Sequence, residues 1–267
     1  MAELSDLVPG AALVTGGGSG IGRAIALALA RDGAPIAVVD LLPEGGQETV
    51  SQITATGGRA AFIRADVSRW EEVDRAFGDA VGQVGPLGIV VNAAGILDGY
   101  TPIEEMEPSL WDRVIAINLT GTFHGCKRAL VELLASDRGR IVNIASTAGL
   151  VGDGGGPAYI ASKHGVVGLT RYLAVNHADR GVTVNAICPG PIQTGLRTHS
   201  MEILGPGAPP MAGRGIGGSE AALRAVVPAG RWGTVEEIAA LARFLASEAA
   251  AYITGQTLVI DGGWTAR

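Results

Sequence analysis

Short apolar, β-branched runs alternate with longer helix-like segments along the whole chain, and this alternation limits the possible folds most strongly. Strand-like runs lie at residues 11–15, 36–40, 60–66, 89–92, 140–144, 183–187 and 257–260. Helical patterns cover residues 20–32, 43–56, 69–82, 108–135, 157–180 and 234–247. Such alternation is typical of a parallel sheet covered on both faces. We therefore expect a single α/β domain over residues 1–267, with a doubly wound parallel sheet of about seven strands.

Residues 190–230 interrupt this regular pattern. A long irregular segment inside a compact domain is usually functional, so we expect a lid here, centred on residues 195–226. We also expect no continuous helix across residues 204–218, where glycine and proline are dense. They are Gly205, Pro206, Gly207, Pro209, Pro210, Gly213, Gly215, Gly217 and Gly218.

Composition excludes several classes of function. A net charge of −6 and a pI near 5.3 argue against a nucleic-acid partner. No apolar run is long enough to span a bilayer, so we expect no membrane partner. Cys126 and Cys188 form no metal-binding spacing, and we expect two buried thiols and no metal site. The first six residues lack the features of a signal peptide, which favours a cytoplasmic location.

A glycine-rich turn, Thr15 to Gly22, joins the first strand-like run to the first helix. Its glycines Gly16, Gly20 and Gly22 follow a G-x-x-x-G-x-G spacing rather than the strict dinucleotide-binding pattern. Such glycines can simply close a turn. In this context, however, they also let a phosphate approach the backbone at a helix N-terminus. The turn therefore predicts a phosphate-binding site.

Asp40 ends the second strand-like run, eighteen residues after Gly22. An acidic residue there can accept hydrogen bonds from both hydroxyls of an adenosine ribose, although it could also be an ordinary turn residue. A 2′-phosphate would be repelled by this carboxylate, and Leu41 and Leu42 offer no compensating arginine. The pattern predicts NAD rather than NADP as the cofactor.

Tyr159 and Lys163 lie four residues apart in a helical segment and so share one face. The chain has only two lysines, against eighteen arginines, although a chance aromatic–cation pair is the alternative interpretation. An ammonium beside a phenol stabilises the phenolate, so we expect a lowered pKa for Tyr159. Ser146 precedes Tyr159 by thirteen residues, and a loop could bring its hydroxyl to the phenol. Together these groups suggest proton transfer to a substrate oxygen.

Through the motifs described above, and others that match in the same order, the chain resembles the short-chain dehydrogenase/reductase family in its classical form. The resemblance covers residues 8 to 264 and implies a single-domain Rossmann fold. The order of the matching motifs and the separations between them make this resemblance specific, although each motif alone is weak evidence. The matching motifs are Thr15 to Gly22, Asp66-Val67, Asn92-Ala93-Ala94-Gly95, Asn118, Ser146, Tyr159-x-x-x-Lys163 and Pro189-Gly190-Pro191-Ile192-Gln193-Thr194.

The resemblance assigns a role to each matching position. It implies that Tyr159 is the general acid/base, that Ser146 binds the substrate oxygen, and that Lys163 holds the nicotinamide ribose. Asn118 would kink a helix and hold a water that connects the lysine to solvent. The expected cofactor-binding residues are Gly16, Ser19, Gly20, Ile21, Gly22, Asp40, Asp66, Val67, Asn92, Ala93, Gly95, Tyr159, Lys163, Pro189, Gly190, Ile192 and Thr194.

These observations favour an NAD(H)-dependent oxidoreductase that interconverts a secondary alcohol and a ketone. One alternative is a 3-oxoacyl-[acyl-carrier-protein] reductase, against which Asp40 argues because biosynthetic reduction usually draws on NADPH. Another is a non-catalytic dinucleotide-binding protein, since a fold alone does not specify activity. Residues 108–135 and 157–180 resemble the family's dimer-forming helices, so we expect a homotetramer. A sugar, a cyclic ketone and an aromatic alcohol all remain open as substrates.

Overall fold

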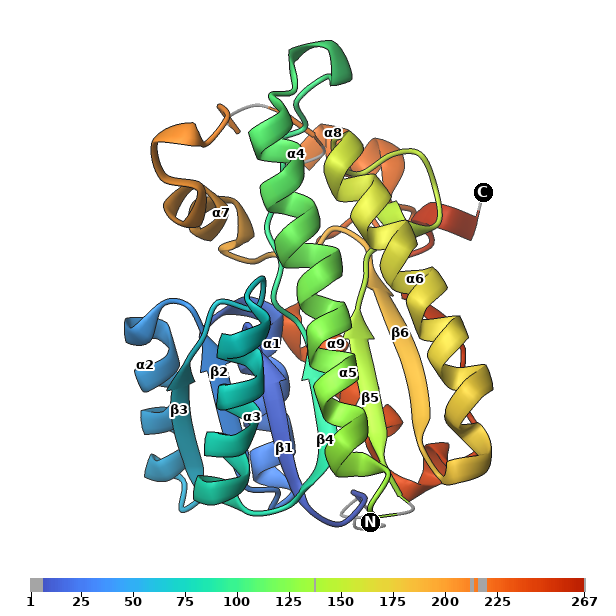
Figure 1. Cartoon of the computed structure of the whole chain (residues 1–267). Coiled ribbons are helices and arrows are strands. Elements are labelled where there is room, and N and C mark those ends of the chain that lie inside the picture. Colours follow the sequence, from blue (N-terminus) through green and yellow to red (C-terminus); the bar gives the residue numbers. More distant parts are fainter. Residues whose placement is uncertain (1–6, 137, 212–213, 216–219, 267) are drawn as a thin grey trace.

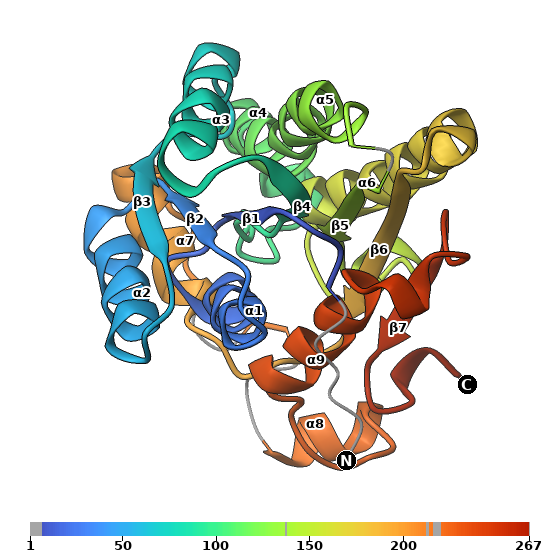
Figure 2. The same ribbon diagram turned by 90° about the horizontal axis from the view of Figure 1, so that it is seen from below.

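Seven parallel strands form one sheet, as predicted, and their order is β3-β2-β1-β4-β5-β6-β7 (Figure 1 and Figure 2). The computed structural model describes residues 7–136, 138–211, 214–215 and 220–266. The strands are β1 (Ala11–Thr15), β2 (Ile36–Asp40), β3 (Ala60–Arg64), β4 (Leu87–Asn92), β5 (Arg140–Ile144), β6 (Thr183–Pro189) and β7 (Thr257–Ile260). All residues of β1, β4, β5 and β6 are buried, as expected of a parallel sheet covered on both faces.

Helices cover both faces of the sheet (Figure 2). One face carries α1 (Gly20–Arg31), α2 (Pro43–Ala55) and α9 (Val235–Leu245). The other carries α3 (Trp70–Val84), α5 (Gly121–Leu133) and α6 (Pro157–His177). Each face has its own apolar core. Ile25, Leu29 and Ile238 belong to the first, and Phe77 and Leu133 to the second.

The chain direction along the sheet reverses between β1 and β4. The strands after β1 in the sequence build outward through β2 to β3, whereas those after β4 build outward through β5 to β7. Ligands of open α/β sheets bind beyond the carboxyl ends of the strands at such a point. The glycine-rich turn after β1 and the loop after β4 therefore meet where a ligand is expected.

The long helix expected over residues 108–135 is continuous but locally unwound. It consists of α4 (Pro108–Ile115), a π-helical segment at Ala116–Thr120, and α5. A π-helical turn inserts an extra residue into a helix and often lies at a functional site. Asn118 sits within this turn, which agrees with the distortion that the family resemblance implied there.

Ser68 does not cap the following helix, although its position before residues 69–82 suggests that it could. The helix α3 begins at Trp70 with Arg69 as its N-cap, and no side chain caps it. The Ser68 hydroxyl instead donates to Asp66 Oδ1 at 2.6 Å and accepts from Arg113 Nη1 at 3.0 Å. A nearby carboxylate and guanidinium thus outcompete the helix terminus for this hydroxyl.

The expected lid contains two short helices, α7 (Leu196–Leu204) and α8 (Glu220–Val226). The helix α7 ends at Leu204, where the glycine- and proline-rich stretch begins, and a single 3₁₀ turn follows at Gly205–Gly207. Gly213, Gly217 and Gly218 lie outside the described residues. In the part of the chain that the structure describes, no helix is both long and apolar enough to cross a membrane.

Candidate active site

A cavity of about 550 Å³ runs along the carboxyl ends of the strands. Seventeen of the predicted site residues line it: Gly16, Ser19, Gly20, Ile21, Gly22, Asp40, Asp66, Val67, Ala93, Gly95, Ser146, Tyr159, Lys163, Pro189, Gly190, Ile192 and Thr194. Asn92 and Asn118 lie behind its wall. The cavity therefore joins the predicted phosphate-binding turn to the predicted proton-transfer residues in one continuous space.

The glycine-rich turn has the close backbone packing that a dinucleotide site needs. Gly16 has a φ of 64°, and a Cβ there would lie 2.7 Å from the backbone N of Ala94. A Cβ at Gly22 would lie 2.1 Å from Gly16 O, so the helix could not approach the turn with any side chain there. Ser19, the N-cap of α1, makes no side-chain capping bond. The first amide groups of α1 thus face the cavity without a side-chain acceptor, which fits an anionic diphosphate.

Asp40 is fixed at the end of β2 by two backbone groups. Its Oδ2 accepts from the N–H of Gly18 at 2.8 Å, and its Oδ1 accepts from the N–H of Leu42 at 3.0 Å. A carboxylate oxygen has lone pairs for more than one donor, so both oxygens can still accept from ligand hydroxyls. The carboxylate is therefore held at the cavity wall in a fixed orientation, as a ribose-binding residue requires.

Asp66 follows β3 and anchors the far end of the cavity. Its Oδ1 accepts from Ser68, and its Oδ2 pairs with Arg113 Nη2 at 3.0 Å. Burial by itself raises the pKa of Asp66, but these hydrogen bonds and the Arg113 charge outweigh it and leave the pKa below its ordinary value. Asp66 is thus an ionised acceptor beside Val67, where the family resemblance places the adenine.

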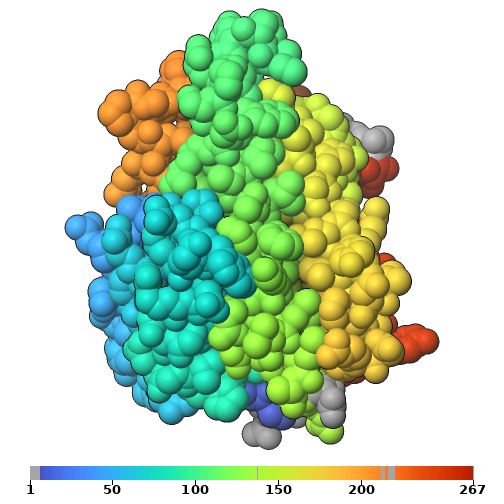
Figure 3. Space-filling view, viewed as in Figure 1, coloured from blue at the N-terminus to red at the C-terminus, as the bar shows by residue number. Residues whose placement is uncertain are grey.

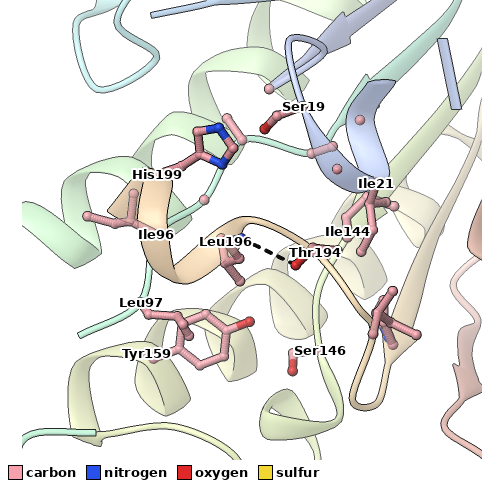
Figure 4. Close-up of a pocket in the computed structure, with 18 of the residues that line it drawn as sticks. Ser19, Ile21, Ile96, Leu97, Ile144, Ser146, Tyr159, Thr194, Leu196 and His199 are labelled. Carbon is pink, nitrogen blue, oxygen red and sulfur yellow. Dashed lines mark hydrogen bonds between the residues drawn. The ribbon is translucent and has the colours of Figure 1, made fainter. Parts of the chain in front are cut away.

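Tyr159 and Ser146 lie at the opposite end of the cavity, below Leu97 and Leu196 (Figure 4), and Lys163 lines the same cavity. Ser146 Oγ accepts from the N–H of Ala148 at 3.1 Å, and its hydroxyl lines the cavity beside the Tyr159 phenol. Lys163 Nζ donates to the Ile144 carbonyl at 2.9 Å and lies 5.6 Å from the centroid of the Tyr159 ring. A phenol and a hydroxyl therefore lie together in the cavity, with an ammonium one helical turn along from the phenol.

The expected lowering of the Tyr159 pKa is wrong for this structure. Burial disfavours the phenolate and raises the pKa of Tyr159 well above its ordinary value, and the neighbouring Ser146 hydroxyl offsets this only in part. The Lys163 ammonium donates to the Ile144 carbonyl. Burial also lowers the pKa of Lys163 to about 8. The sequence showed the pair but not how deeply it is buried.

Asn118 lies directly behind Gly95 and Lys163. A Cβ at Gly95 would be 3.4 Å from Asn118 Oδ1 and 3.5 Å from Lys163 Nζ, so both groups lie against Gly95. The Asn118 amide also donates to Ser162 Oγ at 3.2 Å, in the turn of α6 between Tyr159 and Lys163. Asn118 thus links the π-helical segment to the proton-transfer helix.

Asn92 belongs to a buried polar network beneath the cavity floor. Its amide donates to Asn143 Oδ1 at 2.9 Å and to Cys126 Sγ at 3.4 Å, and Asn143 in turn donates to Thr170 Oγ1. These bonds tie β4 and β5 to the helices on one face. Burial raises the pKa of Cys126 to about 12, which keeps the thiol protonated.

Tyr100, Trp232 and Trp264 also line the cavity, and the sequence did not indicate them, whereas the lining residues Arg197 and His199 belong to the expected lid. Tyr100 is the one non-glycine residue of the described chain with a positive φ, at 56°. Arg197 belongs to the lid and donates to the carbonyls of Met211 and Arg214, both at 2.6 Å. The ring of Trp264 arrives from the C-terminal segment.

The three consecutive glycines at residues 154–156, in the segment just before α6, leave room for three different side chains. A Cβ at Gly154 would lie 2.9 Å from the ring of Trp264, and one at Gly155 would lie 2.5 Å from the ring of Tyr159. A Cβ at Gly156 would lie 2.6 Å from the carboxylate of Asp98. The loop therefore passes between the proton-transfer residue and the outer cavity wall with no space for side chains.

A family model described as Enoyl-(Acyl carrier protein) reductase matches residues 16–265. The chain belongs to the short-chain dehydrogenase/reductase family. Among curated members of this family, 2-(S)-hydroxypropyl-CoM dehydrogenase 3 of Xanthobacter autotrophicus is 41% identical over 255 residues, which are 95% of each chain. Cyclohexanol dehydrogenase of an Acinetobacter species is 38% identical and covers 96% of this chain and 95% of its own.

Solved structures of this family agree with the fold. The crystal structure of levodione reductase has a TM-score of 0.86 and 36% identity over 96% of this chain and 98% of that one. With these relatives, the chain is a short-chain dehydrogenase/reductase oxidoreductase acting on CH–OH groups with a nicotinamide dinucleotide and a small-molecule substrate.

Proposed function

We propose that this enzyme interconverts a secondary alcohol and a ketone with NAD(H), and that Tyr159 transfers the proton. The observation that carries this proposal is that the Tyr159 phenol and the Ser146 hydroxyl line the same cavity as the glycine-rich turn. Lys163, one helical turn along α6, lines that cavity as well. A hydride-transfer site needs a cofactor surface, a proton donor and an orienting hydrogen bond, and this arrangement supplies all three.

Ketone reduction requires one hydride and one proton. The ketone oxygen accepts hydrogen bonds from the Ser146 hydroxyl and the Tyr159 phenol, which orient the carbonyl and stabilise charge on its oxygen. When bound in the cavity, a nicotinamide dinucleotide would supply the hydride for the carbonyl carbon. Tyr159 then gives its phenolic proton to the oxygen and becomes a phenolate, and an alcohol forms. In the oxidative direction the phenolate accepts the alcohol proton.

Lys163 supports this step through its charge and its remaining hydrogens. An ammonium has three donors, and the Ile144 carbonyl takes one of them. The other two can bind the nicotinamide ribose, while the positive charge stabilises the phenolate that forms on Tyr159. We assign to Asn118 the role of holding the π-helical turn against this lysine.

We assign NAD rather than NADP because of Asp40. A fixed carboxylate gains two charge-assisted hydrogen bonds from ribose hydroxyls and meets like charge in a 2′-phosphate. Leu41 and Leu42, the cavity residues next to it, carry no charge that could pair with a phosphate.

The decisive experiment is a screen of secondary alcohols with NAD, followed by nicotinamide absorbance. The panel includes an alicyclic alcohol, a polyol, a hydroxy acid and an aromatic alcohol. We expect NADH formation with at least one of these alcohols. The proposal fails if no panel member is oxidised and no matching ketone is reduced, while the protein still binds NADH.

A second candidate is a 3-oxoacyl-[acyl-carrier-protein] reductase, which would share the acyl-carrier-protein substrate that the description of the family model names, although that description refers to reduction of an enoyl group. This candidate would require reduction of a 3-oxoacyl thioester, with NADPH as the better donor. The carboxylate of Asp40 argues against that donor. Assaying a 3-oxoacyl thioester with each reduced cofactor separates the two candidates.

We further propose a homotetramer. Large apolar side chains are exposed on α5 and α6, which lie side by side on one face of the molecule (Figure 3). Phe123 is 45%, Tyr172 64% and Val175 82% exposed. At the far edge of the sheet, Val259 in β7 is 41% exposed. Two apolar surfaces on different sides of the chain suit closed symmetry with two kinds of interface.

A further inference from the structure

Asp98 is a completely buried carboxylate in the loop after β4. Its partners in the described chain are backbone N–H groups rather than a cation. Its Oδ1 accepts from Gly156 at 2.9 Å and from Tyr100 at 3.2 Å, and its Oδ2 accepts from Tyr159 at 2.9 Å. A buried charge is tolerated only when it is well hydrogen-bonded, so this loop and the start of α6 depend on each other.

Two of these bonds cap the helix that carries the proton-transfer residue. Gly156 is the N-cap of α6 and has no side chain to bond the first amide groups of the helix. Asp98 accepts from the N-cap N–H and from the N–H of Tyr159, as a capping side chain would. Its negative charge also complements the positive end of the helix dipole. Gly156 is required because a Cβ there would collide with this carboxylate.

The third bond holds Tyr100 in its unusual backbone conformation. A positive φ is costly for a tyrosine and persists only where the surroundings enforce it. The Asp98 carboxylate binds the N–H of Tyr100, and the Asp98 carbonyl accepts from Thr101 Oγ1 at 2.8 Å. The Tyr100 ring lines the cavity, 5.3 Å below the guanidinium of the lid residue Arg197.

We propose that Asp98 is the positioning residue of this active site: its carboxylate sets the first turn of α6, and with it Tyr159, while it holds Tyr100 against the substrate end of the cavity. This inference rests on the proposed proton-transfer role of Tyr159. One carboxylate thus couples the wall that contacts the substrate to the group that exchanges its proton.

Because Asp98 is charged, its positioning role predicts a measurable effect on the pKa of Tyr159 as well as an effect on stability. Tyr159 faces Lys163 on its own helix, Ser146 after β5, Cys188 of β6, and both Tyr100 and Asp98 after β4. Asp98 is the carboxylate among them, and its charge raises the pKa of Tyr159. Asp98→Asn should therefore shift the acidic limb of the pH profile for alcohol oxidation to lower pH. A merely structural role would leave that limb in place.

The test compares wild type, Asp98→Asn and the control Asp153→Asn, which removes an exposed carboxylate from the neighbouring loop. We expect Asp98→Asn to bind NADH within about threefold of wild type, to lose at least tenfold in kcat, and to show the shifted limb. Asp153→Asn should match wild type in all three. An Asp98→Asn enzyme with kcat within twofold of wild type and an unshifted limb overturns the proposal.

Hydrogen exchange on the cofactor-free wild type tests the same idea without a variant or a substrate. The amides of Gly156 and Tyr159 should exchange at least tenfold more slowly than that of the exposed Gly152. Equal rates overturn the proposal even if Asp98→Asn fails to fold. If no alcohol is oxidised but these amides are protected, the capping role stands and the proposed function falls.

Discussion

Ser200 of the lid helix α7 accepts a hydrogen bond from the N–H of Leu97, at 2.9 Å. Its hydroxyl donates in turn to the Leu196 carbonyl at 2.6 Å, and both Ser200 and Leu97 are buried. Leu97 and Leu196 line the substrate end of the cavity. A single hydroxyl therefore fastens the lid to the loop after β4, beside the point where Ser146 and Tyr159 meet.

Residues 195–226 should exchange amide hydrogens faster without ligands than with cofactor and substrate, because the lid closes over both. Ser200→Ala leaves the Leu97 N–H unsatisfied, which costs about 1–3 kcal/mol. We expect exchange over residues 196–204 to quicken by about tenfold or more in this variant. The control is Met201→Ala, since Met201 is 49% exposed on the same helix. Equal and strong protection with and without ligands would contradict a moving lid.

Tyr159→Phe should abolish turnover and spare cofactor binding, because it removes only the proton-transferring hydroxyl. A loss of roughly 10²–10⁴ in kcat is expected of a general acid/base. Steady-state kinetics and NADH fluorescence titration measure the two effects. Tyr172→Phe, at an exposed tyrosine of the same helix, serves as the control and should change neither. Near-normal turnover in Tyr159→Phe would refute the assignment. Lys163→Ala should impair both turnover and binding.

Burial of Lys163 predicts a pH-dependent stability difference. Its pKa is lowered to about 8 from the ordinary 10.5, so between these values the unfolded chain holds a proton that the folded chain has lost. The free energy of unfolding therefore rises with pH between about 8 and 10.5, and burial of the charged ammonium destabilises the fold most below pH 8. Lys163→Met should stabilise the free protein near pH 7, by on the order of 3 kcal/mol. This advantage should shrink by about pH 10.

Urea denaturation of both proteins at the two pH values measures this difference. The other lysine of the chain supplies the control, because Lys127 is exposed and Lys127→Met should show no such trend. A Lys163→Met advantage that is the same at both pH values would mean that the ammonium titrates normally.

Cofactor choice should depend on Asp40. Two charge-assisted hydrogen bonds are lost with NADP, each worth on the order of 1.5–3 kcal/mol, so we expect NAD to be preferred by roughly a hundredfold or more in kcat/KM. Asp40→Ser with Leu41→Arg should narrow or invert this preference, since arginine pairs with a phosphate in a fork. Kinetics with both cofactors on both proteins decide it. Equal use of NADP by the wild type would show that Asp40 does not face the ribose.

Assembly should depend on the apolar face of α5 and α6. We expect light scattering to give the mass of four chains at micromolar concentration. Val175→Glu places a charge on this face and should reduce the mass to that of two chains or one. Ser51→Glu adds the same charge to an exposed position of α2, on the other side of the sheet, and should leave the assembly intact. A wild-type monomer would refute the proposal.

The sequence predicted the sheet well because each strand carries its own local signal. Apolar β-branched runs marked all seven strands, although β3 ends two residues earlier, β4 begins two residues earlier and β6 ends two residues later than expected. Both helix ends fell within two residues for α1, α2, α3 and α9, and the helix predicted over residues 108–135 begins with α4 at Pro108 and ends with α5 at Leu133. The predicted site residues that follow the strands could also be found from the sequence, because parallel strands bring their carboxyl ends to one edge of the sheet.

The parts that the sequence did not predict depend on contacts between distant segments. Nothing near Asp98 indicates that its carboxylate reaches Gly156, 58 residues later. Trp264 reaches the cavity only because β7 returns the C-terminal segment to the sheet edge. The raised pKa of Tyr159 likewise follows from burial, which neither its spacing to Lys163 nor its neighbours in the sequence reveal.

The glycines at 154–156 divide this enzyme into a part that can change and a part that cannot. A side chain at these positions would need the space that Trp264, Tyr159 and Asp98 occupy. Selection from random libraries should therefore return glycine at all three positions. Leu196 and Ile203 carry no such restriction and line the cavity from the lid. New substrate preferences can therefore evolve there, while the apparatus that moves the proton is inherited unaltered.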